Sequence, residues 1–219
     1  LLGMTLVLAG CGAGGDEQPA RADSSGASAT QTAEAKSVGG SSEDESSTPP
    51  SSETSSDDGG DYQPATKDGP AKNVPKPTMP DEMKKNTPEG AEAAVQYWWD
   101  TVYYLDETGN SDLMLDASHE DCSYCNRYAT VMEEWYSSEK GWREGSRVTV
   151  GDSFTSEFEG GTQVGSKIDI SEANAWDAEG KPRNDMSDVA YSDESWSFGL
   201  VFDSEDHHWK MWVVNREQP

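Results

Sequence analysis

The most reactive side chains of the sequence are two cysteines, Cys122 and Cys125, separated by two residues. In an oxidising compartment such a pair is expected to form a disulfide, and a loop this short would mainly pin the start of a helix. A thiol oxidoreductase uses the same spacing, but the strand and crossover helix of a thioredoxin-like motif are not evident here. A zinc site would add His119 and either His207 or His208, at a poor spacing. We favour the disulfide, expect no metal and no cofactor, and keep the redox pair and the zinc site as alternatives.

A second set of candidates is polar and lies in segments expected to form strands. Asp152 and Ser156 interrupt an apolar strand face, and His208 begins the last expected strand. If the three lined the concave face of one sheet, a carboxylate buried beside aromatic rings would have a raised pKa and could act as a general base. The simpler interpretation is that the strand curves and these positions reach solvent. The sequence shows no pattern for a Ser/His/Asp nucleophile, a phosphate loop or a calcium loop.

Cys11 follows a short apolar stretch, residues 1–10, that ends in Leu8-Ala9-Gly10. The stretch has about the length of a signal-peptide core and is too short to cross a membrane. A basic region normally precedes such a core, so we expect the precursor to begin further upstream. Leu8-Ala9-Gly10-Cys11 resembles the bacterial lipobox. This resemblance implies cleavage before Cys11, lipidation of its sulfur, and an anchor in the cytoplasmic membrane on the extracytoplasmic face.

The chain after Cys11 divides by composition. Residues 12–86 consist mainly of Ser, Thr, Gly, Pro, Ala and acidic residues, with Tyr62 as their only aromatic side chain. Such a segment buries too little apolar area to offset its ordering entropy, so we expect a disordered tether over residues 11–86. Every Trp and Phe lies after residue 90, which predicts one folded domain over residues 87–219.

The net charge excludes one class of partner. The chain carries a formal charge of −26, and residues 91–219 hold 27 acidic against 9 basic side chains. A field of this sign repels phosphate backbones, so we expect no nucleic acid partner. An acidic surface is also an ordinary route to solubility, and by itself it does not indicate a cationic ligand.

Hydrophobic periodicity predicts helices first and strands afterwards. A capping Thr87 and Pro88 begin a helix expected over residues 88–106, a short helix is expected near residues 113–115, and a third over residues 121–138. The third helix is expected to bury Tyr124, Tyr128, Val131 and Trp135. Alternation then predicts about four strands, and the first has Val148, Val150, Phe154 and Phe158 on one face.

This order predicts an α+β domain in which N-terminal helices pack on a curved antiparallel sheet of about four strands. The order of elements resembles the cone-shaped fold of the nuclear transport factor 2 and ketosteroid isomerase superfamily. The segments Pro88–Ala91, Tyr97-Trp98, Thr108-Gly109 and Cys122–Cys125 also resemble an uncharacterised family of actinobacterial lipoproteins. The C-terminal domain of that family has no assigned function. The family resemblance implies a lipobox, a tether and a domain in this order, and it supplies no substrate or catalytic residue.

We therefore expect a cell-envelope lipoprotein that presents a non-catalytic ligand-binding or interaction domain outside the cytoplasmic membrane. Its partners would be the lipid anchor and an unknown envelope ligand or protein. Two enzymatic alternatives stay open. One is a small-pocket enzyme of the nuclear transport factor 2 type that uses a buried carboxylate, and the other is a thiol oxidoreductase that uses the cysteine pair.

Overall fold

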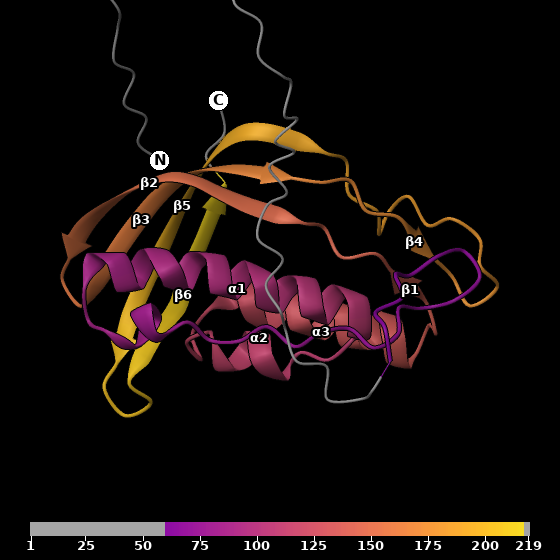
Figure 1. Cartoon of the computed structure of the whole chain (residues 1–219), viewed down its shortest axis with the longest axis horizontal. Coiled ribbons are helices and arrows are strands. Elements are labelled where there is room, and N and C mark those ends of the chain that lie inside the picture. Colours follow the sequence, from indigo (N-terminus) through magenta and orange to yellow (C-terminus); the bar gives the residue numbers. More distant parts are fainter. Residues whose placement is uncertain (1–59, 217–219) are drawn as a thin grey trace, which may run out of the picture. The chain divides into compact units, whose positions relative to one another are not determined.

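A computed structural model of the chain describes residues 60–216 (Figure 1). A short 3-10 helix precedes three α-helices and six strands, and the bounds in chain order are as follows. The helices are the 3-10 helix Asp81–Lys84, α1 Pro88–Thr108, α2 Asp112–Asp116 and α3 Ser123–Ser137. The strands are β1 Trp142–Arg143, β2 Val148–Phe158, β3 Gly161–Ile170, β4 Ala175–Trp176, β5 Tyr191–Asp203 and β6 His208–Arg216.

The longest helix, α1, has the start and stop signals that its sequence predicts. The Thr87 side chain accepts a hydrogen bond from the Gly90 amide, and Pro88 occupies the first turn, where no intrahelical donor is lost. Gly109 ends the helix at φ 72°, a conformation that glycine adopts without strain, and its amide bonds to the Leu105 carbonyl. The helix ends two residues later than periodicity predicts.

The main sheet has the order β2-β3-β5-β6, and every neighbouring pair is antiparallel. The sheet curves over one side of α1, while α2 and α3 lie on the other side of that helix (Figure 1). Between α1 and the sheet, the ring of Trp99 meets those of Trp196 and Phe198 edge-on. The expected α+β class is therefore confirmed. The two-residue strands β1 and β4 form a separate small sheet that periodicity does not predict.

The side chains on the outer face of β2 differ from those expected from strict alternation. A register shift between Val150 and Ser153 places one extra residue in β2. Residues after this bulge therefore point to the face opposite to the one that strict alternation predicts. Val148 and Val150 lie opposite the apolar residues of β3, whereas Phe154 lies opposite Gly165 and is 68% exposed. The expectation that Phe154 shares a face with the two valines is wrong, because strict alternation does not continue through a bulge.

The buried face of α3 is also rotated from the expected one. Trp135 is buried as predicted, but Tyr124 and Val131 are exposed. Cys125 and Met132 complete the buried face instead. Tyr128, also expected to be buried, is half-buried against the core, and the exposed Tyr124 stacks on it.

Residues 60–86 fold with the rest, which differs from the expected domain boundary at residue 87. Gln63 and Lys72 exchange backbone hydrogen bonds in a hairpin, and the hairpin residue Ala65 is buried between Trp142 and Trp176. Further on, Met83 is fully buried in the main core. This N-terminal arm (residues 60–86) returns along α1 to its first turn (Figure 1). The expected tether before residue 60 lies outside the described residues.

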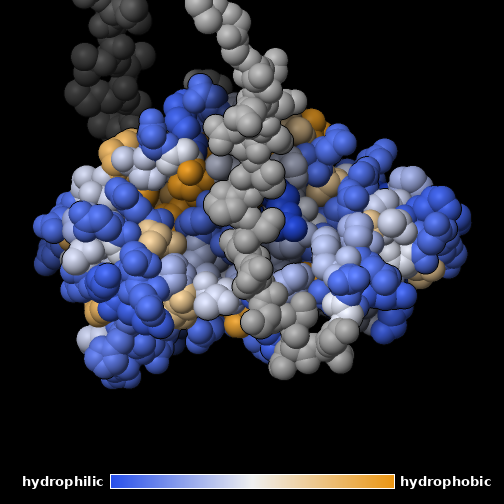
Figure 2. All heavy atoms as spheres, in the orientation of Figure 1, coloured by the Kyte–Doolittle hydropathy of each residue, from blue (hydrophilic) through white to orange (hydrophobic). Residues whose placement is uncertain are grey.

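The surface is mostly hydrophilic, as Figure 2 shows for one face. Within residues 60–216, no helix combines the length and the apolar character that a membrane crossing requires.

Candidate functional site

The three polar strand residues predicted from the sequence do not meet in one pocket. Asp152 lies in the bulge and Ser156 on the outer face of β2, and both are exposed. His208 is buried on β6, with two strands between it and β2. Its ring nitrogens lie 3.2 and 3.3 Å from the backbone oxygens of Asp206 and Asp116, so it joins β6 to the end of α2.

Cys122 and Cys125 are bonded to each other at the start of α3. Both residues are fully buried, and the Cys122 sulfur accepts a hydrogen bond from the Cys125 amide at the helix N-terminus. Thiol exchange needs access to a sulfur, so burial favours a structural role for this disulfide. Two sulfurs bonded to each other do not serve as zinc ligands, and residues 60–216 contain no group of three or more His, Cys, Asp or Glu placed to hold a metal. Cys11 lies outside the described residues.

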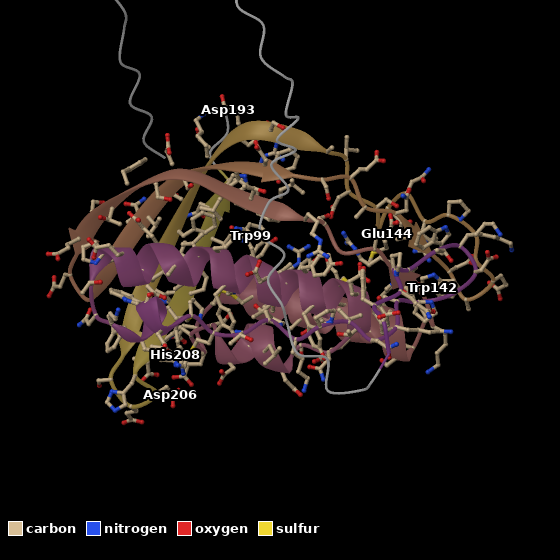
Figure 3. All side chains as sticks on the ribbon, viewed as in Figure 1. Trp99, Trp142, Glu144, Asp193, Asp206 and His208 are labelled. Atoms are coloured by element: carbon tan, nitrogen blue, oxygen red, sulfur yellow. A yellow bond between two sulfur atoms is a disulfide. The ribbon has the colours of Figure 1, made fainter. Side chains whose placement is uncertain are left out.

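The site with the strongest chemical signal is a pocket at the C-terminal end of α1, with a volume of about 310 Å³. Four segments form it: the N-terminal arm, α1, the β1–β2 connection and the β3–β4 connection. Its lining residues are Tyr62, Pro64, Tyr103, Glu107, Glu144, Gly145, Arg147, Glu172 and Asn174. Figure 3 shows Glu144 beside Trp142 at this end of the domain, far from His208 and Asp206. We call this site the α1-end pocket.

Glu107 is the buried acid of the α1-end pocket, with only 2% of its surface exposed. One carboxylate oxygen, Oε1, accepts a hydrogen bond of 2.9 Å from the Gly145 amide. The other oxygen, Oε2, is sealed from solvent and makes no hydrogen bond of standard geometry within the described residues. Gly145 permits this approach, because a Cβ there would lie 2.5 Å from the Tyr103 ring. The donor beside this carboxylate is the Tyr62 hydroxyl, since a side-chain hydrogen bond with Glu107 contributes to the raised pKa of Tyr62.

Two tyrosines and one arginine complete the polar wall. The Tyr62 and Tyr103 hydroxyls lie 2.8 Å apart, and Arg147 donates to the Tyr103 hydroxyl over 2.8 Å. The guanidinium of Arg147 also covers the Tyr103 ring, 3.6 Å from its centre. Burial raises the pKa of Tyr103, and the Tyr62 hydrogen bond and Glu107 charge raise it further. Both hydroxyls therefore stay protonated and able to donate at neutral pH.

A buried charge network lies behind the pocket. Arg143, on β1, is 4% exposed and contacts Asp106 at 3.5 Å and Asp188 more closely. Burial raises the pKa of Asp106 to about 6, although Arg143 and a 2.6 Å hydrogen bond from Tyr128 both favour the carboxylate. Burial lowers the pKa of Arg143, but its neighbours Asp106, Tyr128 and Asp188 together raise it by more, so the guanidinium stays charged. Asp106 does not line the α1-end pocket, and its network joins α1, α3 and β1.

Two other cavities carry weaker signals. One of about 400 Å³ is lined by His119 and Lys210, but Lys210 already pairs with Asp203 and Asp206. Another of about 250 Å³ lies near the β2–β3 turn. Four buried side-chain polar atoms in residues 60–216 lack a partner. Three are indole nitrogens, and Glu107 Oε2 is the fourth and the only charged one.

The family comparison covers the whole of this site. A family model described as "Family of unknown function (DUF6318)" matches residues 60–215. The chain belongs to this family. The DUF6318 match starts with the N-terminal arm, so Tyr62 and every other residue of the α1-end pocket lie inside it.

Other comparisons add little to the DUF6318 assignment. No curated protein matches the chain. A solved structure from Catenulispora acidiphila resembles it with a TM-score of 0.38 and 14% identity, over 58% of this chain and 91% of that one. A likeness this distant carries no argument about function.

Proposed function

We propose that the protein is a cell-envelope lipoprotein in which residues 60–216 form a non-catalytic binding module, with its ligand in the α1-end pocket. The single observation that carries the binding role is the α1-end pocket itself, which has a volume of about 310 Å³ and is lined by three glutamates, two tyrosines and Arg147. The lipobox-like segment Leu8–Cys11 supports the anchor and the extracytoplasmic address.

The arrangement of the pocket favours binding over turnover. Its hydroxyls are engaged with each other and with Arg147. No Ser, Cys or His lines it as a nucleophile, and the groups that could act as a base are the carboxylates of Glu107, Glu144 and Glu172. Most of its polar groups are oriented by hydrogen bonds from the backbone or from one another, as Glu144 is by two bonds of 2.9 Å from Asn174. Such fixed donors and acceptors orient a ligand inside a pocket.

The enzymatic alternative rests on a finer fold proposal, a cone of the nuclear transport factor 2 type with a carboxylate on its concave face. The curved sheet around α1 supports that fold proposal. The centre of the concave face, however, is occupied by Trp99, Trp196 and Phe198. The buried carboxylate with the raised pKa, Asp106, is held by Arg143 and Tyr128, so we rank catalysis below binding.

A defined ligand panel tests the binding role on the full chain. Cys11→Ser is expected to release the chain from membranes, and the isotope-labelled variant is titrated with neutral sugars, carboxylates, amino acids and amines. We expect at least one class to shift the Gly145 amide resonance, and Tyr62→Ala to abolish that shift. His119→Ala, in a different cavity, serves as the control and should change nothing. If no class perturbs Gly145, or if Tyr62→Ala leaves the shift intact, the binding role at this pocket is refuted.

A further inference from the structure

We propose that the outer face of the main sheet binds an extended chain of neutral sugars, which stack on the rings of Phe154, Phe158 and Trp212. None of these three residues lines the α1-end pocket, so this second site goes beyond the proposed function and does not depend on it. Three features support it: the orientation of the rings, the lack of charge between them, and the open side of the sheet on which they lie.

Phe154 and Phe158 lie across glycines of β3. A Cβ at Gly165 would overlap the Phe154 ring, and a Cβ at Gly161 would lie 2.7 Å from the end of the Phe158 ring. Glycine thus permits the close approach of each ring to the backbone. Phe154 is 68% exposed and Phe158 is 38% exposed, so each ring rests on the sheet and leaves part of its surface to solvent. The sheet therefore holds both rings in place as an exposed platform.

Trp212 extends this platform to β6. Its ring centre lies 6.0 Å from that of Phe158, and the two ring planes differ by only 24°. Trp212 is 38% exposed. Phe154 and Phe158 are four positions apart on β2, which corresponds to about 13 Å along a strand. A platform of this length suits an extended polymer better than a single sugar.

The surface between the rings is uncharged. Ser156 and Gln163 are cross-strand partners between the two phenylalanines, and both are exposed. Glu157 alternates to the opposite face, where its partner Thr162 is buried. In a chain with a formal charge of −26, an uncharged surface favours a neutral ligand. The six residues that β2 and β3 place on this face after the bulge are Phe154, Ser156, Phe158, Gly161, Gln163 and Gly165.

A neutral pyranose sugar matches both parts of this surface. Its C–H bonds present slightly positive hydrogens to the negative face of an aromatic ring, and its hydroxyls can bond to a side-chain hydroxyl or amide such as those of Ser156 and Gln163. Nucleic acid bases also stack on aromatic rings, but the negative charge of the chain repels phosphates. The same charge disfavours an anionic lipid surface and a second copy of this chain.

The outer face is open to a large ligand. Within residues 60–216, the helices all lie on the other side of the sheet, and β2 is an edge strand (Figure 1). Phe158 also lines the cavity of about 250 Å³ at the β2–β3 turn, together with Asn86 and Thr162. These two polar side chains provide further hydrogen-bonding groups beside one end of the platform.

The test titrates the isotope-labelled Cys11→Ser chain with cellohexaose and chitohexaose, which are neutral, and with glucose and a galacturonate hexamer for comparison. We expect at least one neutral hexamer to shift the Gly165 amide resonance, and glucose and the acidic hexamer to shift it weakly or not at all. Phe154→Ala and Trp212→Ala should each weaken binding about threefold or more, and the double variant about tenfold or more, because a stacking ring is lost. Tyr124→Ala is the matched control, since Tyr124 is also 38% exposed but lies on α3, and it should leave the affinity unchanged.

The inference is overturned if neither neutral hexamer shifts Gly165, or if Tyr124→Ala weakens binding as much as Trp212→Ala does. It is also overturned if the two ring variants abolish binding to phosphatidylcholine vesicles or self-association in sedimentation, because the face would then serve a membrane or a second copy. The Gly145 amide reports on the α1-end pocket in the same titration. A shift at Gly145 without one at Gly165 would leave the proposed function standing and refute the sugar site, whereas a shift at Gly165 alone would support the sugar site by itself.

Discussion

At Asp106, burial of the carboxyl raises the pKa by more than the ion pair with Arg143 lowers it. Its side chain contacts Arg143 at 3.5 Å and Tyr128 at 2.6 Å, yet its pKa is raised to about 6 because the carboxyl is removed from water. The unfolded chain releases this proton near pH 4, before the folded chain does. The stabilisation that this group contributes is therefore fully present below about pH 4. As the pH rises to about 6, the free energy of unfolding falls by roughly 3 kcal/mol.

Asp106→Asn should remove this loss. We expect the variant to gain stability relative to the wild type, by up to roughly 3 kcal/mol, as the pH rises from about 4 to about 6.5. Urea unfolding at several pH values measures the difference. Tyr128→Phe removes a hydrogen bond that favours the carboxylate, so it should extend the loss to higher pH. Parallel pH curves for the wild type and Asp106→Asn would show that Asp106 does not titrate in this range.

Sequence patterns could not find these acids. Glu107 lies 38 residues from its partner Gly145, and Asp106 lies 22 residues from its partner Tyr128, so no local spacing joins either pair. The apolar stripe of α1 correctly predicts the helix, but it gives no sign that the last turn carries two buried acids. The disulfide could be predicted from the sequence, because Cys122 and Cys125 are three positions apart in the chain.

At the scale of elements, the bulge in β2 decides which side chains reach the core. Gly151 lies within the shifted register, and an isolated glycine in a strand is the signal that alternation alone ignores. Without the bulge, Phe154 would be a core residue and Ser153 an outer one. The bulge instead turns Ser153 inward, where its hydroxyl contacts that of Ser166, and leaves the Phe154 ring lying across Gly165.

Two phenylalanine substitutions test this assignment of faces. Phe198→Ala should cost about 3 to 5 kcal/mol, because Phe198 is fully buried against α1. Phe154→Ala should cost about 1 kcal/mol or less, because that ring is 68% exposed. Chemical denaturation of both variants gives the two values. Equal costs would mean that β2 keeps strict alternation and that Phe154 belongs to the core.

At the scale of the whole molecule, composition predicted the helical and strand-rich part but not where the folded unit begins. The N-terminal arm contributes few apolar residues, so its composition resembles that of a disordered tether. Tryptophans elsewhere in the domain bind it: Trp142 packs on Ala65 and donates a hydrogen bond to the Thr66 carbonyl over 2.7 Å, and Trp209 donates to the Lys85 carbonyl over 2.8 Å. A polar segment can therefore be ordered when the rest of the domain supplies the rings that cover it.

Limited trypsin digestion tests whether the arm is held in this way. Lys67 and Lys72 lie in the hairpin whose strands are joined by backbone hydrogen bonds, so cleavage after them should be slow and the resistant fragment should retain Tyr62. Trp142→Ala removes the bond to Thr66 and the ring that covers Ala65, so it should speed cleavage at both lysines while α1 stays folded by circular dichroism. Trp212→Ala, on the outer part of β6, is the matched control and should leave the cleavage rate unchanged. Rapid cleavage after Lys72 in the wild type would place the start of the folded unit beyond the hairpin and would remove Tyr62 from the α1-end pocket.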